Sequence, residues 1–328
     1  MSVAARTLPF VDLTSVQERI LRDLVAIGAG TAFPPGIEAR FRRRIEREIE
    51  PFLPARPLRL WKERLNEHAR CEGLFASVLA GEAPPFAYGP RSAEGTLVHK
   101  AIELEIGSSR PADPHEVADR AAVALAGDRQ FGPYWVGLDD LDRDGLLMRT
   151  VQTLESFRAS FPPFHLLRRA IVPVCEHWLE ATFGGGVVTV VGKVDLMLNR
   201  PDPARGTRVL IDLKTGGAWP DHAEDMRLYA LLYTLRYGIP PYRVATLFLR
   251  AGSTQAELVT ERTLDRAADR VVAAVRTAAR VSNGGHPREL RPGPHCGRCP
   301  RRASCPALRQ AGGEGRVTHP VAGDPGVA

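Results

Sequence analysis

Two aspartates and a lysine lie at spacings that could support metal-dependent chemistry. Asp195 lies within the apolar run 190–198, and Asp212 and Lys214 lie within a second apolar run, 209–214. Two neighbouring strands would bring the aspartates side by side, where their mutual repulsion favours a shared cation. Because side chains alternate along a strand, Asp212 and Lys214 would share one face. A metal polarises a phosphoryl oxygen and lowers the pKa of bound water, so the set predicts phosphodiester hydrolysis; the alternative is an exposed strand with an Asp–Lys pair.

A second group of residues could bind metal through sulfur. Three cysteines near the C-terminus have the spacing C-x2-C-x5-C: Cys296, Cys299 and Cys305. Thiolates this close in sequence form a chelate, and a tetrahedral or cubane site requires a fourth ligand. Cys71 and Cys175 are the candidates for that ligand. A four-thiolate site suits both zinc and iron–sulfur, so the residue types leave both open, including a zinc site in which His295 replaces one cysteine.

The composition is that of a globular chain with an uneven choice of basic residue. Of the 44 basic residues only four are lysines, and the formal net charge is +6. The arginine excess fits either the codon bias of a GC-rich genome or phosphate binding by guanidinium groups. No apolar stretch is long enough to span a bilayer, and the first residues lack a secretory signal pattern. We therefore expect a cytoplasmic protein with no membrane partner.

The elements that must position these residues are helices around a small sheet. Apolar residues recur at helical spacing in segments 16–27, 37–49, 58–79, 93–106, 113–126, 138–160, 221–237 and 264–281. Apolar, β-branched runs predict strands at 167–175, 187–198, 207–213, 243–250 and 255–262. Glycines at 184–186 predict a hairpin turn, and the Gly- and Pro-rich segment 81–90 predicts a loop. This succession predicts an α/β fold.

The residues around the carboxylates resemble the PD-(D/E)XK nucleases of the RecB type. The matching motifs are Gly192-x-x-Asp195, Asp212-x-Lys214-Thr-Gly216 and, upstream, Gly95-x-x-x-His99. The resemblance implies a restriction-endonuclease-like core, in which a small mixed sheet is flanked by helices. It implies that Asp195 and Asp212 bind Mg²⁺ or Mn²⁺, assisted by His99 and by the backbone carbonyl of Leu213. Lys214 would position or activate the attacking water and stabilise the transition state.

The helix after the lysine strand departs from the family pattern. Where the family has Gln-x-x-x-Tyr, this chain has Asp225-x-x-x-Tyr229. In the family this helix helps to hold the lysine and the DNA backbone, which makes Tyr229 and Arg227 candidates for DNA contact. An acidic residue at position 225 would weaken the approach of phosphate unless Arg227 or another basic group offsets it. Glu176 and Glu180 could supply further carboxylates to the metal, or could form an exposed strand end.

The cysteines resemble those of the iron–sulfur subgroup of RecB-like nucleases, which includes CRISPR-associated exonucleases. That subgroup has one cysteine before the nuclease motifs and three after them, which implies Cys71 as the fourth ligand of a [4Fe–4S] cluster, with Zn²⁺ as the alternative. Cys175, on a predicted strand, would then be a small buried apolar residue. The cluster would tie residue 71 to residues 296–305 and contribute to folding. The arginines among the ligands could present a basic rim to single-stranded DNA: Arg298, Arg301 and Arg302.

Together these expectations define an organisation and a function. They divide the chain into a helical N-terminal region, 1–85, a nuclease core, 86–285, a cysteine segment, 286–308, and a disordered tail, 309–328. They predict a metal-dependent DNA nuclease that acts on ends or single strands, in repair, recombination or phage- and CRISPR-related processing. The sequence has no G-x-x-x-x-G-K-[ST] phosphate loop, so unwinding would need a helicase partner. The alternatives are a non-catalytic, nuclease-like subunit of a helicase–nuclease complex, and a zinc-binding DNA-associated regulator.

Overall fold

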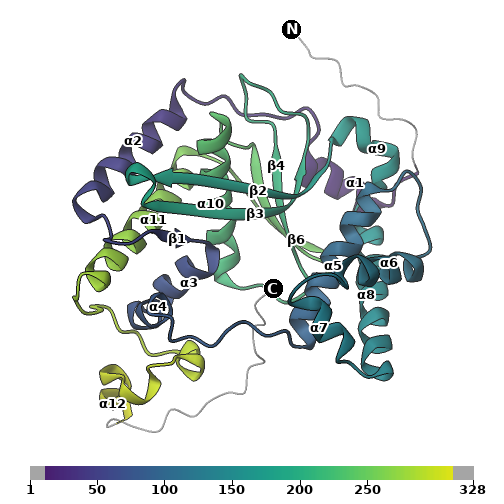
Figure 1. The fold of residues 1–328 in the computed structure, drawn as a ribbon. Coiled ribbons are helices and arrows are strands. Elements are labelled where there is room, and N and C mark those ends of the chain that lie inside the picture. Colours follow the sequence, from purple (N-terminus) through teal and green to yellow (C-terminus); the bar gives the residue numbers. More distant parts are fainter. Residues whose placement is uncertain (1–11, 313–328) are drawn as a thin grey trace.

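A mixed β-sheet with helices on both faces organises the chain (Figure 1). The computed structural model describes residues 12–312. Its strands are β1 Leu58–Leu60, β2 Val174–Phe183, β3 Val188–Leu198, β4 Val209–Lys214, β5 Arg243–Phe248 and β6 Ser253–Leu258. The predicted α/β class, with a small mixed sheet flanked by helices, is confirmed.

Strand β3 is the centre of the sheet. It pairs antiparallel with β2 along almost its whole length, parallel with β1 at residues 188–190 and antiparallel with β4 at residues 196–198. Between the last two pairings, residues 191–195 have no strand partner on that edge among the strands described. The predicted turn between β2 and β3 is confirmed, because all three glycines from Gly184 to Gly186 have positive φ, which favours glycine.

The other strands extend the sheet beyond β4. Strands β4 and β5 are parallel, and they are joined by the crossover helix α10, Pro220–Tyr237, as a parallel connection requires. Strand β6 then pairs antiparallel with β5.

Two helical layers cover the sheet (Figure 1). On one face lie α2 Ile37–Ile49, α3 Lys62–Arg70, α4 Glu72–Leu79, α10 and α11 Glu261–Ser282. On the other face lie α1 Ser15–Arg19, α5 Pro90–Gly107, α6 Pro114–Leu125, α7 Phe131–Val136, α8 Asp140–Ser160 and α9 Phe164–Ile171. Each layer packs its apolar side chains against one face of the sheet and forms a separate buried cluster. Within residues 12–312, none of the helices has both the length and the apolar character that crossing a membrane requires.

Two of the predicted elements are wrong. The segment 58–79 is not one helix: β1 comes first, and the chain is extended again at Cys71 (φ −167°), which separates α3 from α4. The segment predicted as a strand from 167 to 175 is largely α9, and β2 begins only at Val174. Phe164, Leu167 and Ile171 are all buried, and their spacing places them on one face of a helix. A short apolar run of this kind is compatible with either a strand or a buried helix, and here it forms a helix.

Short helical turns complete the chain. The segment predicted as a helix from 16 to 27 begins as α1 and continues as a π-helical turn, Ile20–Val25. Short 3₁₀ turns occur at Glu50–Phe52, Gly184–Gly186, Pro294–Arg298 and Arg302–Ser304. Helix α12 covers Pro306–Gly312, so the first residues of the predicted tail are helical, and residues 313–328 lie outside the described part of the chain.

Candidate active site

The two predicted aspartates lie together at the edge of the β3–β4 pairing. Leu196 pairs with Ile211, so Asp195 and Asp212 follow one residue beyond the last pair and face each other across the two strands. Both carboxylates are buried, with exposed fractions of 8% for Asp195 and 2% for Asp212. Leu213 is buried in the core, as strand alternation predicts.

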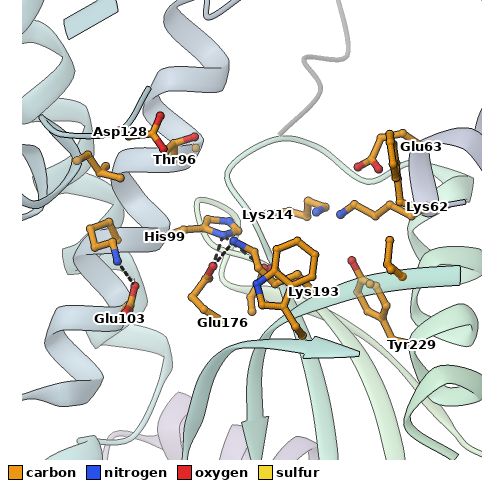
Figure 2. Close-up of a pocket in the computed structure, with 18 of the residues that line it drawn as sticks. Lys62, Glu63, Thr96, His99, Glu103, Asp128, Glu176, Lys193, Lys214 and Tyr229 are labelled. Carbon is orange, nitrogen blue, oxygen red and sulfur yellow. Dashed lines mark hydrogen bonds and ion pairs between the residues drawn. The ribbon is translucent and has the colours of Figure 1, made fainter. Parts of the chain in front are cut away.

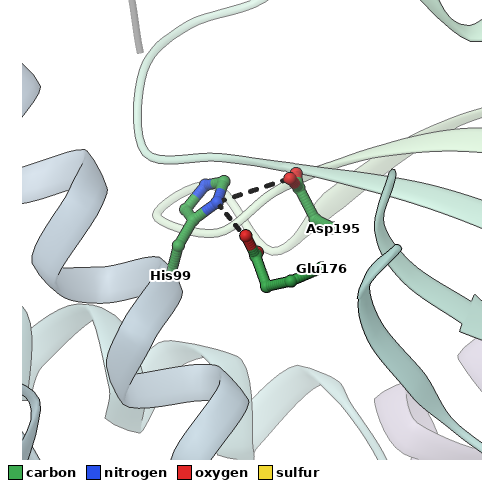
Figure 3. A group of neighbouring side chains, drawn as sticks. All are labelled: His99, Glu176 and Asp195. Carbon is green, nitrogen blue, oxygen red and sulfur yellow. Dashed lines mark ion pairs between the residues drawn. The ribbon is translucent and has the colours of Figure 1, made fainter. Parts of the chain in front are cut away.

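A group suited to a divalent cation forms around Asp195 (Figure 3). Ligand atoms of His99, Glu176 and Asp195 all lie within 4.8 Å of one another. The Nδ1 atom of His99 is 3.5 Å from Asp195 Oδ1 and 4.0 Å from Glu176 Oε1. One imidazole nitrogen and two carboxylates form a donor set that suits Mn²⁺ or Mg²⁺.

His99 is oriented by the backbone of β4. Its Nε2 lies 3.0 Å from the carbonyl oxygen of Leu213. Because a carbonyl can only accept, Nε2 must carry the proton, and Nδ1 is the nitrogen that faces the carboxylates. The Leu213 carbonyl, predicted as a metal ligand, therefore accepts the hydrogen bond that fixes the histidine ring.

Leu213 also orients Asp195, through its backbone amide. The Leu213 N–H donates to Asp195 Oδ2 at 2.7 Å. Burial would raise the pKa of Asp195, but His99 and the nearby lysines outweigh it and hold the pKa well below its usual range. Burial would likewise lower the pKa of His99, but Asp195 raises it. Asp195 is therefore ionised, and a metal at this group would compete with protons for Nδ1 of His99.

Glu176 is the third member of this group, and the sequence did not distinguish it from Glu180. It has φ of +53°, a backbone conformation that residues other than glycine rarely adopt and that is concentrated at functional sites. Its carboxylate is paired with Lys193 as well as facing His99. Glu180 instead pairs with the exposed Arg59, away from this group. The sequence contains no signal for the unusual backbone of Glu176.

Asp212 is paired with two lysines. Lys214 Nζ lies 2.5 Å from Asp212 Oδ2, which confirms that the two side chains share a face. Lys62 Nζ lies 3.5 Å from the other oxygen, Oδ1. Burial would lower the pKa of Lys62, but Asp212 raises it well above its ordinary value, so the ammonium group stays charged. Lys62 was not among the predicted site residues, because the segment 58–79 was predicted to be a single helix with no role in the site.

Gly192 on β3 and Tyr229 on α10 pack against each other next to the site. A Cβ atom at position 192 would lie 2.7 Å from the Tyr229 ring, so only glycine allows β3 and α10 to approach this closely. Tyr229 is 1% exposed. Its ring therefore packs beneath the site and forms part of the cavity lining, and contact with a DNA backbone would require more of it to become accessible.

Asp225 is buried, and its carboxylate contacts residues of α3 and α11. Its Oδ1 accepts a hydrogen bond from Asn66 Nδ2 at 3.1 Å and lies 3.8 Å from Arg270 Nη1. Burial raises its pKa to about 6, while Lys62 and Arg270 oppose that rise. Arg227, predicted as the compensating base, is instead paired with Glu224 and Glu257.

The group of His99, Glu176 and Asp195 opens into a cavity of about 630 Å³ (Figure 2). His99, Glu176, Asp195 and Lys214 line it, and Trp61 and Trp178 also contribute to its walls. A second cavity of about 620 Å³ shares Lys62, Glu63 and Lys214 with the first. The two cavities thus meet at the lysines beside Asp212.

Comparison with known families identifies this arrangement. A family model described as the PD-(D/E)XK nuclease superfamily matches residues 63–306, most of the chain. The chain belongs to the PD-(D/E)XK nuclease superfamily. Its mixed sheet between helical layers is the restriction-endonuclease-like fold, and the family's general activity is metal-dependent nucleolytic hydrolysis.

Two further comparisons add little. No curated protein matches the sequence. Among solved structures, one titled "Crystal structure of SSO0001" is similar at 16% identity, covering 64% of this chain and 94% of that chain, with a TM-score of 0.28. A similarity at that TM-score carries no argument about fold or function.

The PD-(D/E)XK chain also brings its four predicted cluster cysteines into one region. Cys71, between α3 and α4, packs against Cys299 and Leu290. Burial raises the pKa of Cys299, and the neighbouring thiols Cys71, Cys296 and Cys305 raise it further. Although burial opposes it, hydrogen bonds from the His295 side chain and from backbone amides lower the pKa of Cys71 to about 7. All of these cysteines are unbridged thiols, a form suited to metal ligation.

The C-terminal segment is anchored beside Cys71 by a carboxylate as well. Glu72 accepts hydrogen bonds from the backbone amides of Arg288 and Glu289 and from the Arg280 side chain. These bonds outweigh burial and lower the pKa of Glu72 to about 2. Cys175, on β2, lies apart and packs in the second apolar cluster.

The arginines predicted to rim the cluster have different surroundings. Arg301 forms a two-bond ion pair with Glu82, at 2.6 and 2.7 Å. Arg298 lines the second cavity, and Arg302 is exposed. Arg298 therefore shares the second cavity with Lys62 and Lys214.

Proposed function

We propose that this chain is a Mg²⁺- or Mn²⁺-dependent deoxyribonuclease that hydrolyses phosphodiester bonds at DNA ends or in single strands. The observation that supports it most directly is the placement of the His99–Glu176–Asp195 group beside the Asp212–Lys214 pair. Ligands for a cation and a fixed ammonium group thus face one cavity. A non-catalytic role would not require this combination.

The residues of the site have distinct roles in the proposed reaction. His99, Glu176, Asp195 and Asp212 would hold the divalent ion, which supplies phosphoryl polarisation and a bound water of lowered pKa. The Leu213 amide and carbonyl fix Asp195 and His99, so these two ligands are oriented before substrate binds. Lys214 would stabilise negative charge on the reacting phosphate.

The walls of the cavities favour an extended single strand as substrate. Trp178 is 65% exposed, lies beside Lys193 in the β2–β3 pairing and lines the same cavity as Trp61. Exposed aromatic rings next to cations are the usual platform for unpaired bases. The two joined cavities would let the chain continue past Lys62 and Lys214 toward Arg298.

Replacing the exposed tryptophan tests this substrate path. Trp178→Ala is expected to raise KM for single-stranded DNA about tenfold, because a stacked base contributes about 1–3 kcal/mol, with little change in kcat. Initial rates on a labelled single strand and on a blunt duplex measure the effect. Trp178→Phe, which keeps an aromatic face, should retain most of the affinity. An equal change on both substrates would contradict stacking of unpaired bases.

We also propose that Cys71, Cys296, Cys299 and Cys305 bind a [4Fe–4S] cluster, as in the iron–sulfur branch of RecB-like nucleases. The grouping of the cysteines supports this proposal, because Cys71 packs against Cys299, and Cys296 and Cys305 lie close enough to influence the pKa of Cys299. A four-thiolate site also suits Zn²⁺, and the sulfide content of the purified protein distinguishes the two. A partner helicase would supply unwinding, because the chain has no phosphate loop.

One assay tests the proposed activity and its need for an end. End-labelled linear DNA and covalently closed circles, single- and double-stranded, are incubated with the purified protein in Mn²⁺ or Mg²⁺. We expect linear single strands to be degraded and closed circles to persist, with all cleavage stopped by EDTA. Cleavage of circles would indicate an endonuclease. No cleavage of any substrate with either metal would contradict the proposal.

A further inference from the structure

Lys62 is a charged group at the site that the proposed reaction leaves without a role. It comes from α3, whereas the motif residues come from α5 and strands β3 and β4. Asp212 therefore has an ammonium group on each oxygen, Lys214 at Oδ2 and Lys62 at Oδ1. Figure 2 shows Lys62 and Lys214 approaching the same point from opposite sides.

The fold holds Lys62 in this place through several contacts. The short strand β1 pairs with the beginning of β3, and α3 starts two residues after β1 ends. Lys62 therefore enters beside the part of β3, residues 191–195, that has no strand partner on this edge. Its ammonium group lies 5.9 Å from the centre of the Tyr229 ring. One helical turn later, Asn66 bonds to Asp225 and ties α3 to α10.

The charges around Lys62 are balanced. Lys62, Lys214 and Arg270 bring three positive charges into a region that also contains Asp212, Asp225 and Asp195. Asp225 is close enough to Lys62 to influence it, yet it forms no direct ion pair with it within 4.0 Å. Asp225 thus supplies a negative charge close to an additional buried cation, in the lining of the second cavity.

The ion pair with Asp212 competes with the proposed role of Lys214 at the phosphate. A tight ion pair at 2.5 Å occupies the same ammonium group that must face the reacting phosphate. A second cation on Asp212 reduces the free energy needed to separate that pair, because the carboxylate is not left without a counterion in a buried place.

We propose that Lys62 is a positioning residue that holds Asp212 and so releases Lys214 to face the scissile phosphate. This inference rests on the proposed nuclease function. Lys62 acts through Asp212 and Lys214, and it need not touch the DNA. Its removal should therefore affect kcat more than KM.

A double-mutant cycle with two readouts tests the proposal. Lys62→Met is expected to lower kcat about ten- to a hundredfold, with little change in KM. In a Lys214→Met background the same substitution should cause no further loss, because Lys62 would act only through Lys214. Titration of the apoprotein with MnCl₂ alone should show binding about fivefold tighter in Lys62→Met, because a positive charge next to a metal ligand is gone.

Matched variants exclude a purely structural effect. Lys62→Arg keeps the charge and should keep most of kcat and the wild-type Mn²⁺ affinity. Arg22→Met also removes a positive charge, at an exposed arginine that pairs with Asp23 and lines neither cavity, and should leave both unchanged. A misfolded Lys62→Met protein would lose Mn²⁺ affinity and kcat together, which is opposite to the expected split.

Three results would overturn the inference: wild-type kcat in Lys62→Met, an equal loss in both backgrounds, or unchanged or weaker Mn²⁺ binding. If the wild-type protein cleaves no DNA, the nuclease proposal fails, and the Mn²⁺ titration still decides whether Lys62 acts on Asp212.

Discussion

Asp212→Asn is expected to lower metal-dependent DNA cleavage by about a thousandfold, equal to about 4 kcal/mol of transition-state stabilisation. The substitution keeps the shape of a side chain that is only 2% exposed, but removes the charge that faces both the metal-binding group and two lysines. With Lys62 and Lys214 left beside a neutral amide, their repulsion would also weaken cation binding. Single-turnover cleavage of a labelled strand in Mn²⁺ measures the loss.

The comparison requires that the variant still folds and binds DNA. Asp265→Asn, at an exposed aspartate paired with Arg44, makes the same chemical change far from the cavity and should retain full activity. Filter binding in Ca²⁺ or EDTA should show that Asp212→Asn retains DNA affinity. Cleavage at wild-type rates by the purified variant would exclude the proposed mechanism.

Cys299→Ser is expected to remove the proposed cluster and lower Tm by about 3–6 °C, as a loss of about 2–4 kcal/mol would in a chain of 328 residues. Cys299 packs against Cys71 and has the other cluster cysteines as neighbours, so a serine here would disrupt the thiol group at its centre. Iron and acid-labile sulfide per chain, measured after anaerobic purification, should fall to background. Differential scanning calorimetry measures the change in stability.

Cys175→Ser is the matched control, because it changes a thiol on β2 outside this group. It can reduce stability through packing, but its iron and sulfide content should equal that of the wild type. Zinc at one equivalent per chain, with no sulfide, would show that the site holds a single ion instead of a cluster.

Much of the candidate site could be predicted from the sequence, because strand alternation and motif spacing are local properties. Asp212 and Lys214 share a face because they are two residues apart on β4, and this could be read directly. His99 could be predicted only from the family motif, because a single histidine in a helix has no sequence pattern that indicates a metal ligand. In the structure, its Nδ1 lies 3.5 Å from Asp195 Oδ1.

Lys62 was not predicted as a site residue, and Glu176 was not distinguished from Glu180, because their positions depend on contacts between distant parts of the chain. Glu176 faces the site because its backbone adopts a positive φ on β2. Lys62 reaches Asp212 because β1, only three residues long, pairs with β3 more than a hundred residues later in the chain. A run of apolar residues at helical spacing concealed that strand. The same ambiguity explains why α9 was predicted as part of a strand.

The Glu72 contacts have a consequence for how the protein matures. This one carboxylate holds the backbone at residues 288 and 289 without any contribution from sulfur or metal. The C-terminal segment can therefore dock beside Cys71 during folding, and the proposed cluster would be inserted afterwards into a prearranged set of thiols. Cofactor insertion would then be a late step on a folded polypeptide. We expect the apoprotein to regain iron and sulfide on reconstitution without first being denatured, and a need for unfolding and refolding would contradict this order of assembly.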